Sequence, residues 1–225
     1  MKLLIYGHKN EEIIKKVEKA GFDIVENNPD IVAVVGGDGT LMKSEKDYPE
    51  IPKFILQKSK TAKKGHDLSP EEILEKLKNK EYKIEDEIKI EASNDGKKIV
   101  GLNEIIVHNV DPRQAIRYEI FINGKKACRE VIGDGVVVST VYGSTGYYRA
   151  ITGSFFELGI GVAFNNSTEQ SDHMVLKEDS EIIVKITRGK AIAYADNSDE
   201  EIILDDNDEL LIKKYKNKAK IVKFI

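Results

Sequence analysis

The chain has 225 residues, 40% of them hydrophobic, and this length suffices for one large domain or two small ones. Its 35 Lys and Arg residues and 39 Asp and Glu residues give a formal net charge of -4, which argues against a nucleic-acid partner because no overall basic surface results. The single cysteine, Cys128, excludes an intramolecular disulfide, and no apolar run approaches the ~20 residues of a membrane span, so we expect a cytoplasmic protein with no membrane partner.

Strands and helices alternate in the first part of the chain. Short runs rich in β-branched residues predict strands, and apolar residues at helical spacing predict amphipathic helices. Ser69 and Glu72 form a capping-box pattern, with Pro70 in the first turn of the helix that follows. The predicted strands are residues 2–6, 22–25, 31–35 and 53–56, and the predicted helices are residues 10–20, residues 40–46 and a segment starting at residue 69. This alternation is typical of a small α/β domain with a parallel sheet.

After residue 81 the pattern changes to strands with stretches of period-two alternation, and Asn94-Asp95-Gly96 and Asn123-Gly124 are hairpin turn signals. The predicted strands are residues 82–93, 97–109, 116–123, 125–132, 136–140, 161–165, 181–187, 191–195, 200–204, 209–214 and 219–224. We therefore predict an α/β domain at residues 1–81 and a mostly antiparallel β-rich domain at residues 82–225, with a last strand that could pack back on the first domain. Two domains joined by a short link favour a ligand site in the cleft between them.

Gly36-Gly37-Asp38-Gly39-Thr40 directly follows the apolar run at residues 31–35. Glycines let the chain turn at the end of a buried strand and bring backbone N–H groups close to an anionic ligand. A single carboxylate in such a turn suits phosphoryl transfer, where it accepts a hydroxyl proton or serves a metal ion. The alternative is a glycine-rich β-turn that contains an ordinary Asp.

Gly133-Asp134-Gly135 precedes a second strand, and a segment rich in Ser, Thr and Gly follows that strand at residues 139–147. Hydroxyl groups and free N–H groups in such a segment can bind a nucleotide at the start of a short helix. The alternative is a Ser/Thr/Gly loop with a helix cap.

Asn103 and Glu104 form a polar pair within a run that is otherwise apolar. Polar side chains within a buried strand need hydrogen-bond partners. The pair could be a β-bulge with solvated side chains, or its side chains could point into the cleft.

Taken in their order along the chain, residues 36–40, then Asn103-Glu104, then residues 133–147, the three motifs resemble those of the NAD kinase family, which phosphorylates the 2′-hydroxyl of the adenosine ribose of NAD to make NADP. The glycine motif at residues 36–40 alone is shared with diacylglycerol kinases, sphingosine kinases and phosphofructokinases, whereas the ordered set is much more specific. The resemblance extends from the first strand to near the C-terminus, where Ala195-Asp196-Asn197 stands in place of the usual Asp-Gly turn. It implies a dinucleotide bound between the two domains, ATP or polyphosphate as donor, a divalent ion, commonly Mg²⁺, and a dimer or tetramer.

The resemblance also implies a role for individual residues. Asp38 would be the catalytic acid/base beside the 2′-hydroxyl, and the rest of the first motif would hold the donor phosphates. These phosphate-binding residues are Gly36, Gly37, Gly39 and Thr40. The implied NAD-binding residues are Asn103 and Glu104, Asp134 at the nicotinamide end, and Tyr142, Thr145, Gly146 and Tyr147 around the adenine and nicotinamide subsites.

Some positions depart from the pattern of the family. The usual glycine-rich loop with an aromatic residue is replaced at residues 57–66 by a lysine-rich segment, which could clamp the donor phosphates or be a solvated loop. The lysines concerned are Lys58, Lys60, Lys63 and Lys64. Tyr142 replaces a small hydroxyl residue that often faces adenine, and Gly146 replaces a usual Ala. The four histidines, His8, His66, His108 and His173, lack metal-ligand spacing, so we expect no metal held by the protein itself.

These motifs favour an NAD kinase, and two other functions stay open. One is a lipid or small-polyol kinase, which would share only the motif at residues 36–40 and would leave Asn103-Glu104 unexplained. The other is a non-catalytic protein that binds NAD or NADP, which the altered lysine segment favours and Asp38 disfavours.

Overall fold

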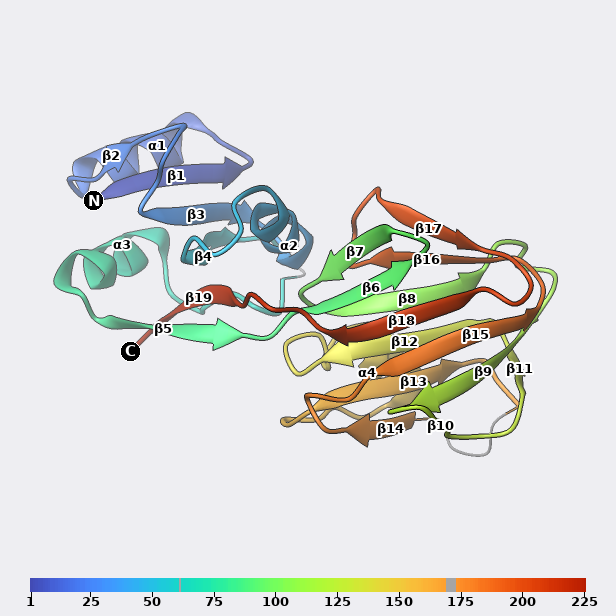
Figure 1. The fold of residues 1–225 in the computed structure, drawn as a ribbon. Helices are drawn as coiled ribbons and strands as arrows, with labels where there is room; N and C mark the ends of the chain where they lie inside the picture. The colour runs from blue at the N-terminus through green and yellow to red at the C-terminus, as the bar shows by residue number, and fades with distance from the viewer. Residues whose placement is uncertain (61, 169–172) are drawn as a thin grey trace. The chain divides into compact units, whose positions relative to one another are not determined.

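The computed structural model describes residues 1–60, 62–168 and 173–225. These residues form two compact units (Figure 1): Met1–Glu87 with Lys218–Ile225, and Ile88–Asn217. This division differs from the predicted boundary at residue 81. The strand β5 (Tyr82–Glu87) is part of the first unit because it pairs along its whole length with β19 (Ala219–Phe224), so the last strand lies in the sheet of the first unit.

The first unit is built around a six-stranded sheet with the spatial order β2-β1-β3-β4-β19-β5. Four parallel strands come first: β1 (Lys2–Gly7), β2 (Asp23–Ile24), β3 (Ile31–Gly36) and β4 (Lys53–Lys58). β19 is parallel to β4 and β5 is antiparallel to β19, so the sheet is mixed at one edge. Every residue of β3 is buried, as is typical of a central strand covered on both faces.

The described residues of the first unit also form the helices α1 (Glu11–Lys19), α2 (Asp38–Asp47) and α3 (Pro70–Asn79). The Asn10 side chain caps α1 by accepting a hydrogen bond from the Ile13 N–H at 2.9 Å. The predicted capping box of Ser69 and Glu72 at the start of α3 is confirmed. The apolar faces of α1 and α3 bury Ile13, Val17, Ile73, Leu74 and Leu77 in one core with β-strand residues such as Leu3, Ala33, Phe54 and Val222.

The second unit consists of two antiparallel sheets that enclose one hydrophobic core. The β9 sheet contains β10 (Lys125–Lys126), β9 (Ile116–Ile122), β15 (Ile182–Arg188), β18 (Glu209–Lys214), β6 (Ile90–Asn94) and β7 (Lys97–Gly101), with β11 (Val131–Gly133) also paired to β9. The β8 sheet contains β14 (His173–Leu176), β13 (Ile160–Asn165), β12 (Gly135–Thr140), β8 (Glu104–Asn109), β16 (Ala191–Ala195) and β17 (Glu201–Leu204). The helix α4 (Tyr147–Thr152) packs on Ile106, Val137 and Ala163, residues that do not belong to the core between the sheets.

Three long predicted strands are interrupted in the structure. Residues 82–93 divide into β5 and β6 in different units, residues 97–109 into β7 and β8 in different sheets, and residues 125–132 into β10 and β11. The chain folds closely on itself between β7 and β8, because a Cβ atom at Gly101 would lie 2.6 Å from the carbonyl oxygen of Glu104. The predicted hairpins are confirmed, since Asn94 pairs with Lys97 and Ile122 pairs with Lys125.

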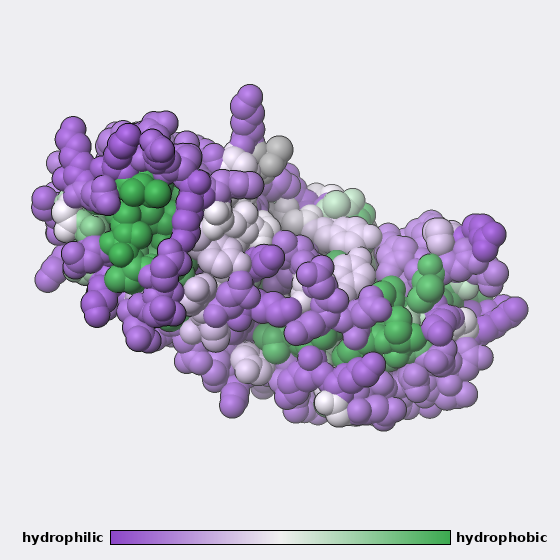
Figure 2. All heavy atoms as spheres, turned by 90° about the horizontal axis from the view of Figure 1, so that it is seen from above, coloured by the Kyte–Doolittle hydropathy of each residue, from purple (hydrophilic) through white to green (hydrophobic). Residues whose placement is uncertain are grey.

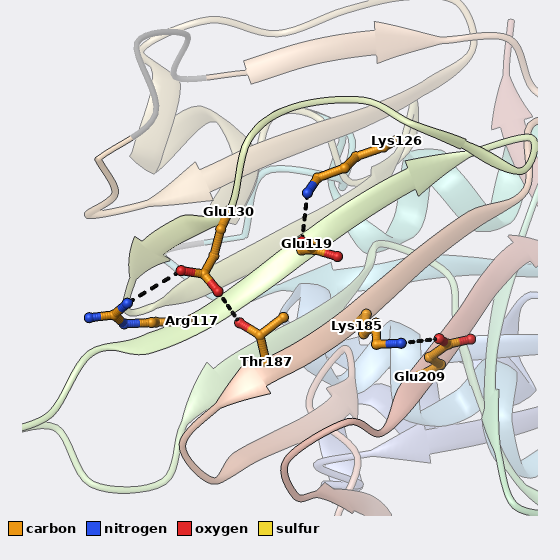
Figure 3. Close-up of polar contacts among 7 residues, drawn as sticks. All are labelled: Arg117, Glu119, Lys126, Glu130, Lys185, Thr187 and Glu209. Atoms are coloured by element: carbon orange, nitrogen blue, oxygen red, sulfur yellow. Dashed lines mark hydrogen bonds and ion pairs between the residues drawn. The ribbon is translucent and has the colours of Figure 1, made fainter.

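The face of the molecule drawn in Figure 2 is mostly polar. Hydrophilic side chains cover most of the face in Figure 2, and the hydrophobic ones form separate areas among them. Figure 3 shows three separate groups of polar contacts on the β9 sheet: Lys126–Glu119 at 2.6 Å, Lys185–Glu209 at 3.0 Å, and Glu130 with Arg117 at 3.4 Å and with Thr187 at 2.7 Å. Among the described residues, no helix is long and apolar enough to cross a membrane.

Candidate functional site

The glycine motif of the first unit lies at the junction of β3 and α2. β3 ends at Gly36, Gly37 caps the helix, and α2 begins at Asp38, two residues earlier than predicted. Asp38 therefore lies in the first turn of α2, where the helix dipole favours a negative charge. Thr40 packs closely on the turn, because a Cβ atom at Gly36 would lie 2.4 Å from its Oγ1. The motif thus holds one carboxylate beside a compact backbone turn.

The segment after β4 folds onto Asp38. The backbone N–H of Lys63 lies 3.1 Å from each carboxylate oxygen of Asp38, and the N–H of Lys64 donates to Oδ1 at 3.0 Å. The Ser59 N–H donates to the carbonyl oxygen of Gly36 at 3.1 Å, so the segment is joined to the glycine turn at two places. The backbone of this segment therefore orients the carboxylate of Asp38.

The four lysines of that segment differ in their surroundings. Lys58, Lys60 and Lys63 are exposed and Lys64 is half-buried. The Lys58 ammonium forms an ion pair with Asp67. The exposed side chains are compatible with both interpretations of the segment, a phosphate clamp and a solvated loop, so the role of these lysines stays a prediction. Thr61, in the middle of the segment, lies outside the described residues.

Glu104 is the first residue of β8 in the second unit and Asn103 directly precedes it, and both are 7% exposed. The interpretation as a bulge with solvated side chains is therefore wrong. The Asp196 carboxylate accepts hydrogen bonds from the N–H groups of Leu102 at 2.7 Å, Asn103 at 2.8 Å and Glu104 at 3.0 Å. Burial raises the pKa of Asp196, and the three N–H donors act in the opposite direction. Asp196 thus fixes the backbone that carries the polar pair.

The segment after β12 is bound to the same backbone. The Asn103 carbonyl oxygen accepts hydrogen bonds from the Thr140 N–H at 2.8 Å and the Ser139 hydroxyl at 3.3 Å. The Thr140 hydroxyl donates to the Leu102 carbonyl at 2.7 Å and accepts from the Gly143 N–H at 3.1 Å. A Cβ atom at Gly143 would lie only 2.2 Å from the Asn103 oxygen. Two predicted motifs, far apart in sequence, therefore form one rigid site.

The side chains of the polar pair reach the start of α4. A Cβ atom at Gly146 would lie 3.6 Å from Oε2 of Glu104 and 4.0 Å from Nδ2 of Asn103. Within residues 1–60, 62–168 and 173–225, nothing hydrogen-bonds to Oδ1 of Asn103, although that oxygen is buried. A buried acceptor of this kind is costly without a partner. A ligand that donates a hydrogen bond would therefore stabilise the site.

The other predicted site residues of the second unit lie in different environments. Tyr147, the first residue of α4, is half-buried, and its hydroxyl lies 3.4 Å from Nδ2 of Asn165. Thr145 is half-buried in the turn that leads into α4. Tyr142 is only 6% exposed, so its ring belongs to the interior of the unit. The contacts of these residues with NAD stay predictions.

Asp134 lies apart from this cluster. It stands before the first residue of β12, whereas Glu104 pairs with Ser139 near the last. At about 3.3 Å per residue, the five residue steps from Asp134 to Ser139 separate the two positions by roughly 17 Å along the strand. The Asp134 carboxylate accepts from Nδ2 of Asn166 at 2.9 Å and from Nδ2 of Asn109 at 3.4 Å. The structure therefore does not bring Asp134 together with Asn103 and Glu104.

Side chains that could bind a metal ion are scattered over the described residues. In that part of the chain, no group of three or more His, Cys, Asp or Glu side chains is placed to hold a metal ion. His173 lies in β14 with its ring 5.7 Å from that of Tyr148, and Asp172 beside it is outside the described residues. The donor set of the described residues thus offers no cage for a divalent cation, although Asp38 could contact one that is carried by phosphates.

The sequence is similar to that of known proteins. The model of the ATP-NAD kinase C-terminal domain matches residues 102–224. The NAD kinase of Sulfurisphaera tokodaii is 30% identical in an alignment that covers 100% of this chain and 96% of the relative. The NAD kinase of Thermococcus kodakarensis is 28% identical over 97% of this chain and 79% of the relative.

Two solved structures are similar in fold. The crystal structure of an NAD kinase from Archaeoglobus fulgidus in complex with ATP has a TM-score of 0.81 at 21% identity, covering 100% of this chain and 93% of that one. The crystal structure of yeast NADH kinase complexed with NADH also has a TM-score of 0.81, at 17% identity and with coverage of 100% and 84%. At these identities the likeness establishes the fold.

Together with these relatives, the α/β unit with its glycine turn and the β-rich unit with its polar pair define an enzyme of the phosphotransferase class. The domain match spans more than half of the chain, and the Sulfurisphaera tokodaii alignment spans all of it. The chain belongs to the ATP-NAD kinase family.

Proposed function

We propose that this protein transfers the γ-phosphoryl group of ATP to the 2′-hydroxyl of the adenosine ribose of NAD, which yields NADP and ADP. The observation that carries the proposal is the rigid site at Asn103 and Glu104, where a buried amide oxygen and a carboxylate lie beside the turn at Gly146. A lipid or polyol kinase that shares only the motif at residues 36–40 would not explain this site. A ribose hydroxyl can donate a hydrogen bond to the amide oxygen of Asn103.

In the proposed reaction, Asp38 is the general base. Its carboxylate takes the proton of the 2′-hydroxyl as the ribose oxygen attacks the γ-phosphorus and the bond to the bridging oxygen of ADP breaks. The N–H groups of Lys63 and Lys64 support the base by orienting its oxygens. The donor phosphates would contact the turn at Gly36, Gly37, Gly39 and Thr40. Catalysis is then mainly the positioning of two substrates.

The donor and its metal ion are finer points of the same proposal. Mg²⁺, bound by the phosphates of the donor, would neutralise their charge, and Asp38 would be its nearest carboxylate in the glycine turn. Lys58, Lys60, Lys63 and Lys64 would bind the phosphates of ATP or polyphosphate as mobile point charges. A cytoplasmic location, a role in NADP biosynthesis and a dimeric or tetrameric state accompany this proposal.

The test is NADP formation from NAD, ATP and Mg²⁺, with polyphosphate as a second donor. We expect NADP from the native chain and a loss of roughly 10²-fold or more in kcat for Asp38→Asn. Asp95→Asn is the matched control, because Asp95 lies in the exposed β6–β7 turn, and it should keep native activity. Calorimetry with NAD should give similar affinities for all three proteins. NAD binding without NADP from either donor would overturn the proposal and leave a dinucleotide-binding protein.

A further inference from the structure

Tyr194 lies on the same face of the β8 sheet as Glu104. It is directly paired with Ile106, and residues two apart on a strand share a face, so Glu104, Ile106 and Tyr194 point to the same side. The neighbours of Tyr194 on β16, Ala193 and Ala195, are fully buried in the core on the opposite side. Tyr194 itself is half-buried. It therefore stands on the outer face, next to the strand that begins with the polar pair.

The helix α4 brings Tyr147 to this face. Tyr147 and Tyr194 both pack against one apolar cluster, whose buried members are Ile106, Val137, Tyr148, Phe156 and Ala163. Burial raises the pKa of Tyr194 above its ordinary value of 10.0, and the nearby Tyr147 and Glu104 raise it further. Its phenol is thus neutral at physiological pH and keeps a proton to donate. Three elements, β8, α4 and β16, contribute to this group.

The group has a complementary set of hydrogen-bonding atoms. A carboxylate oxygen such as those of Glu104 can accept a hydrogen bond, whereas a neutral phenol can donate one. A sugar hydroxyl can donate to the first and accept from the second. A carboxylate and a phenol on one face therefore suit a ribose hydroxyl better than either group alone.

We propose that Tyr194 is a further dinucleotide-binding residue, whose hydroxyl donates a hydrogen bond to a ribose hydroxyl held by Glu104. The inference rests on the proposed function, since it takes NAD as the ligand of this site. It goes beyond the predicted site, which contains Glu104 and Tyr147 but not Tyr194. Tyr194 contributes to the affinity for NAD and plays no part in proton transfer.

The test compares Tyr194→Phe, which removes only the hydroxyl, with Tyr215→Phe as a control in the same unit. Isothermal calorimetry with NAD should show about a tenfold weaker Kd for Tyr194→Phe, equivalent to about 1.4 kcal/mol, and a native Kd for the control. In steady-state assays, KM for NAD should rise similarly, whereas kcat and KM for ATP stay within about twofold. Thermal midpoints of both variants should match the native chain, which separates a binding role from a structural one.

Two NAD analogues, one without the 3′-hydroxyl of the adenosine ribose and one without that of the nicotinamide ribose, show which hydroxyl the Tyr194 side chain contacts. With the analogue that lacks the hydroxyl held by Tyr194, the native chain and Tyr194→Phe should bind equally. A native Kd for Tyr194→Phe, or an equal rise of KM for NAD and for ATP, would overturn the inference. Calorimetry needs no turnover, so it tests the role of Tyr194 independently of the enzymatic activity. A native chain that binds NAD but makes no NADP would refute the proposed function, and the Kd of Tyr194→Phe would still decide whether Tyr194 binds NAD.

Discussion

The carboxylate of Asp196 accepts a hydrogen bond from the backbone N–H of Asn103 at 2.8 Å, although the two residues are 93 positions apart in the sequence. The backbone of Asp196 also bonds to the other residue of the pair, because the Asp196 N–H donates to the carbonyl oxygen of Glu104 at 3.0 Å. Asp196 adopts a left-handed conformation with φ of +51°, which lets one short side chain reach several N–H groups. A tight turn after β16 thereby sets the conformation of the polar pair at the start of β8.

Replacement of Asp196 should weaken the site without abolishing it. In Asp196→Asn, the amide oxygen can still accept from Asn103 and Glu104, but the amide NH₂ would face the N–H of Leu102. Two donors facing each other leave that N–H unpaired, so we expect about 1–3 kcal/mol of destabilisation and a higher KM for NAD. Urea unfolding and steady-state kinetics measure both effects.

Asp199→Asn is the control for this prediction, because Asp199 is an exposed residue close to Asp196 in the same segment. The Asp199→Asn variant should have the native free energy of unfolding and the native KM for NAD. A native KM for NAD in Asp196→Asn would contradict the assignment of Asp196 as the residue that positions Asn103 and Glu104.

Two glycines of the segment at residues 139–147, Gly143 and Gly146, should respond differently to replacement by alanine. A Cβ atom at Gly143 would lie 2.2 Å from the Asn103 carbonyl oxygen, whereas the nearest atom to a Cβ at Gly146 is the Gly143 oxygen at 3.1 Å. Gly143→Ala must displace the backbone of the polar pair, so we expect a loss of at least about tenfold in kcat/KM for NAD, about 1.4 kcal/mol of transition-state stabilisation. Gly146→Ala needs only a shift of a few tenths of an ångström and should keep activity within about threefold. Equal activities of the two variants would refute the close approach.

A buried ion pair holds α2 against β4. Lys53 is fully buried and pairs with Glu45, and its ammonium also donates to the carbonyl oxygens of Tyr48 at 3.1 Å and Ile51 at 2.8 Å. Lys53→Met removes the cation beside a buried carboxylate, which typically costs about 3–5 kcal/mol. We expect the free energy of unfolding of the full chain, measured with urea, to decrease by this amount.

The double variant Lys53→Met with Glu45→Leu removes both charges and should recover much of that loss. Lys15→Met, at the exposed pair with Glu11, provides the control and should leave unfolding nearly unchanged. If the single and double variants at Lys53 unfolded alike, the loss would not arise from the unpaired charge.

Local patterns in the sequence predict much of this fold. The alternation of apolar runs and amphipathic helices indicates the α/β unit, and the capping box at Ser69 and the turn at Asn123-Gly124 appear where they are predicted. The break between β7 and β8 could not be predicted, because it depends on hydrogen bonds from residues 102–104 to Asp196, far away in the sequence. Periodicity within a window carries no information about such a partner.

The same limit applies to the candidate site. Asp38, Asn103, Glu104 and Gly146 stand out by residue type and order, and the structure brings the last three together. Tyr194 could not be found in this way, since it is one aromatic residue in an alternating strand and only the pairing of β16 with β8 places it beside Glu104. The burial of Lys53 could not be predicted either, because a lysine at the start of a strand normally has a solvent-exposed side chain.

His66 should make the stability of the chain depend on pH. Its ring contacts Phe224 at a centroid distance of 5.1 Å, and burial, followed by the charge of Lys223, lowers its pKa below the ordinary value of 6.5. A backbone hydrogen bond with Val222 and, to a smaller extent, the charge of Asp67 oppose this lowering of the pKa, whereas a still smaller repulsion from Lys58 adds to it. The folded chain therefore favours the neutral imidazole, and protonation favours the unfolded chain.

As the pH falls through 6.5, the unfolded chain takes up a proton that the folded chain does not, and stability decreases until the lowered pKa is reached. Because His66 is partly solvated, we expect the thermal midpoint to fall by less than about 4 °C across this window, since 1 kcal/mol corresponds to about 2–4 °C at this chain length. His66→Phe should remove this part of the pH dependence and keep the contact with Phe224, whereas the control His8→Gln, at an exposed residue, should retain it. Thermal unfolding from pH 7.5 to pH 5 gives the comparison, and an unchanged pH dependence in His66→Phe would assign the effect to another group.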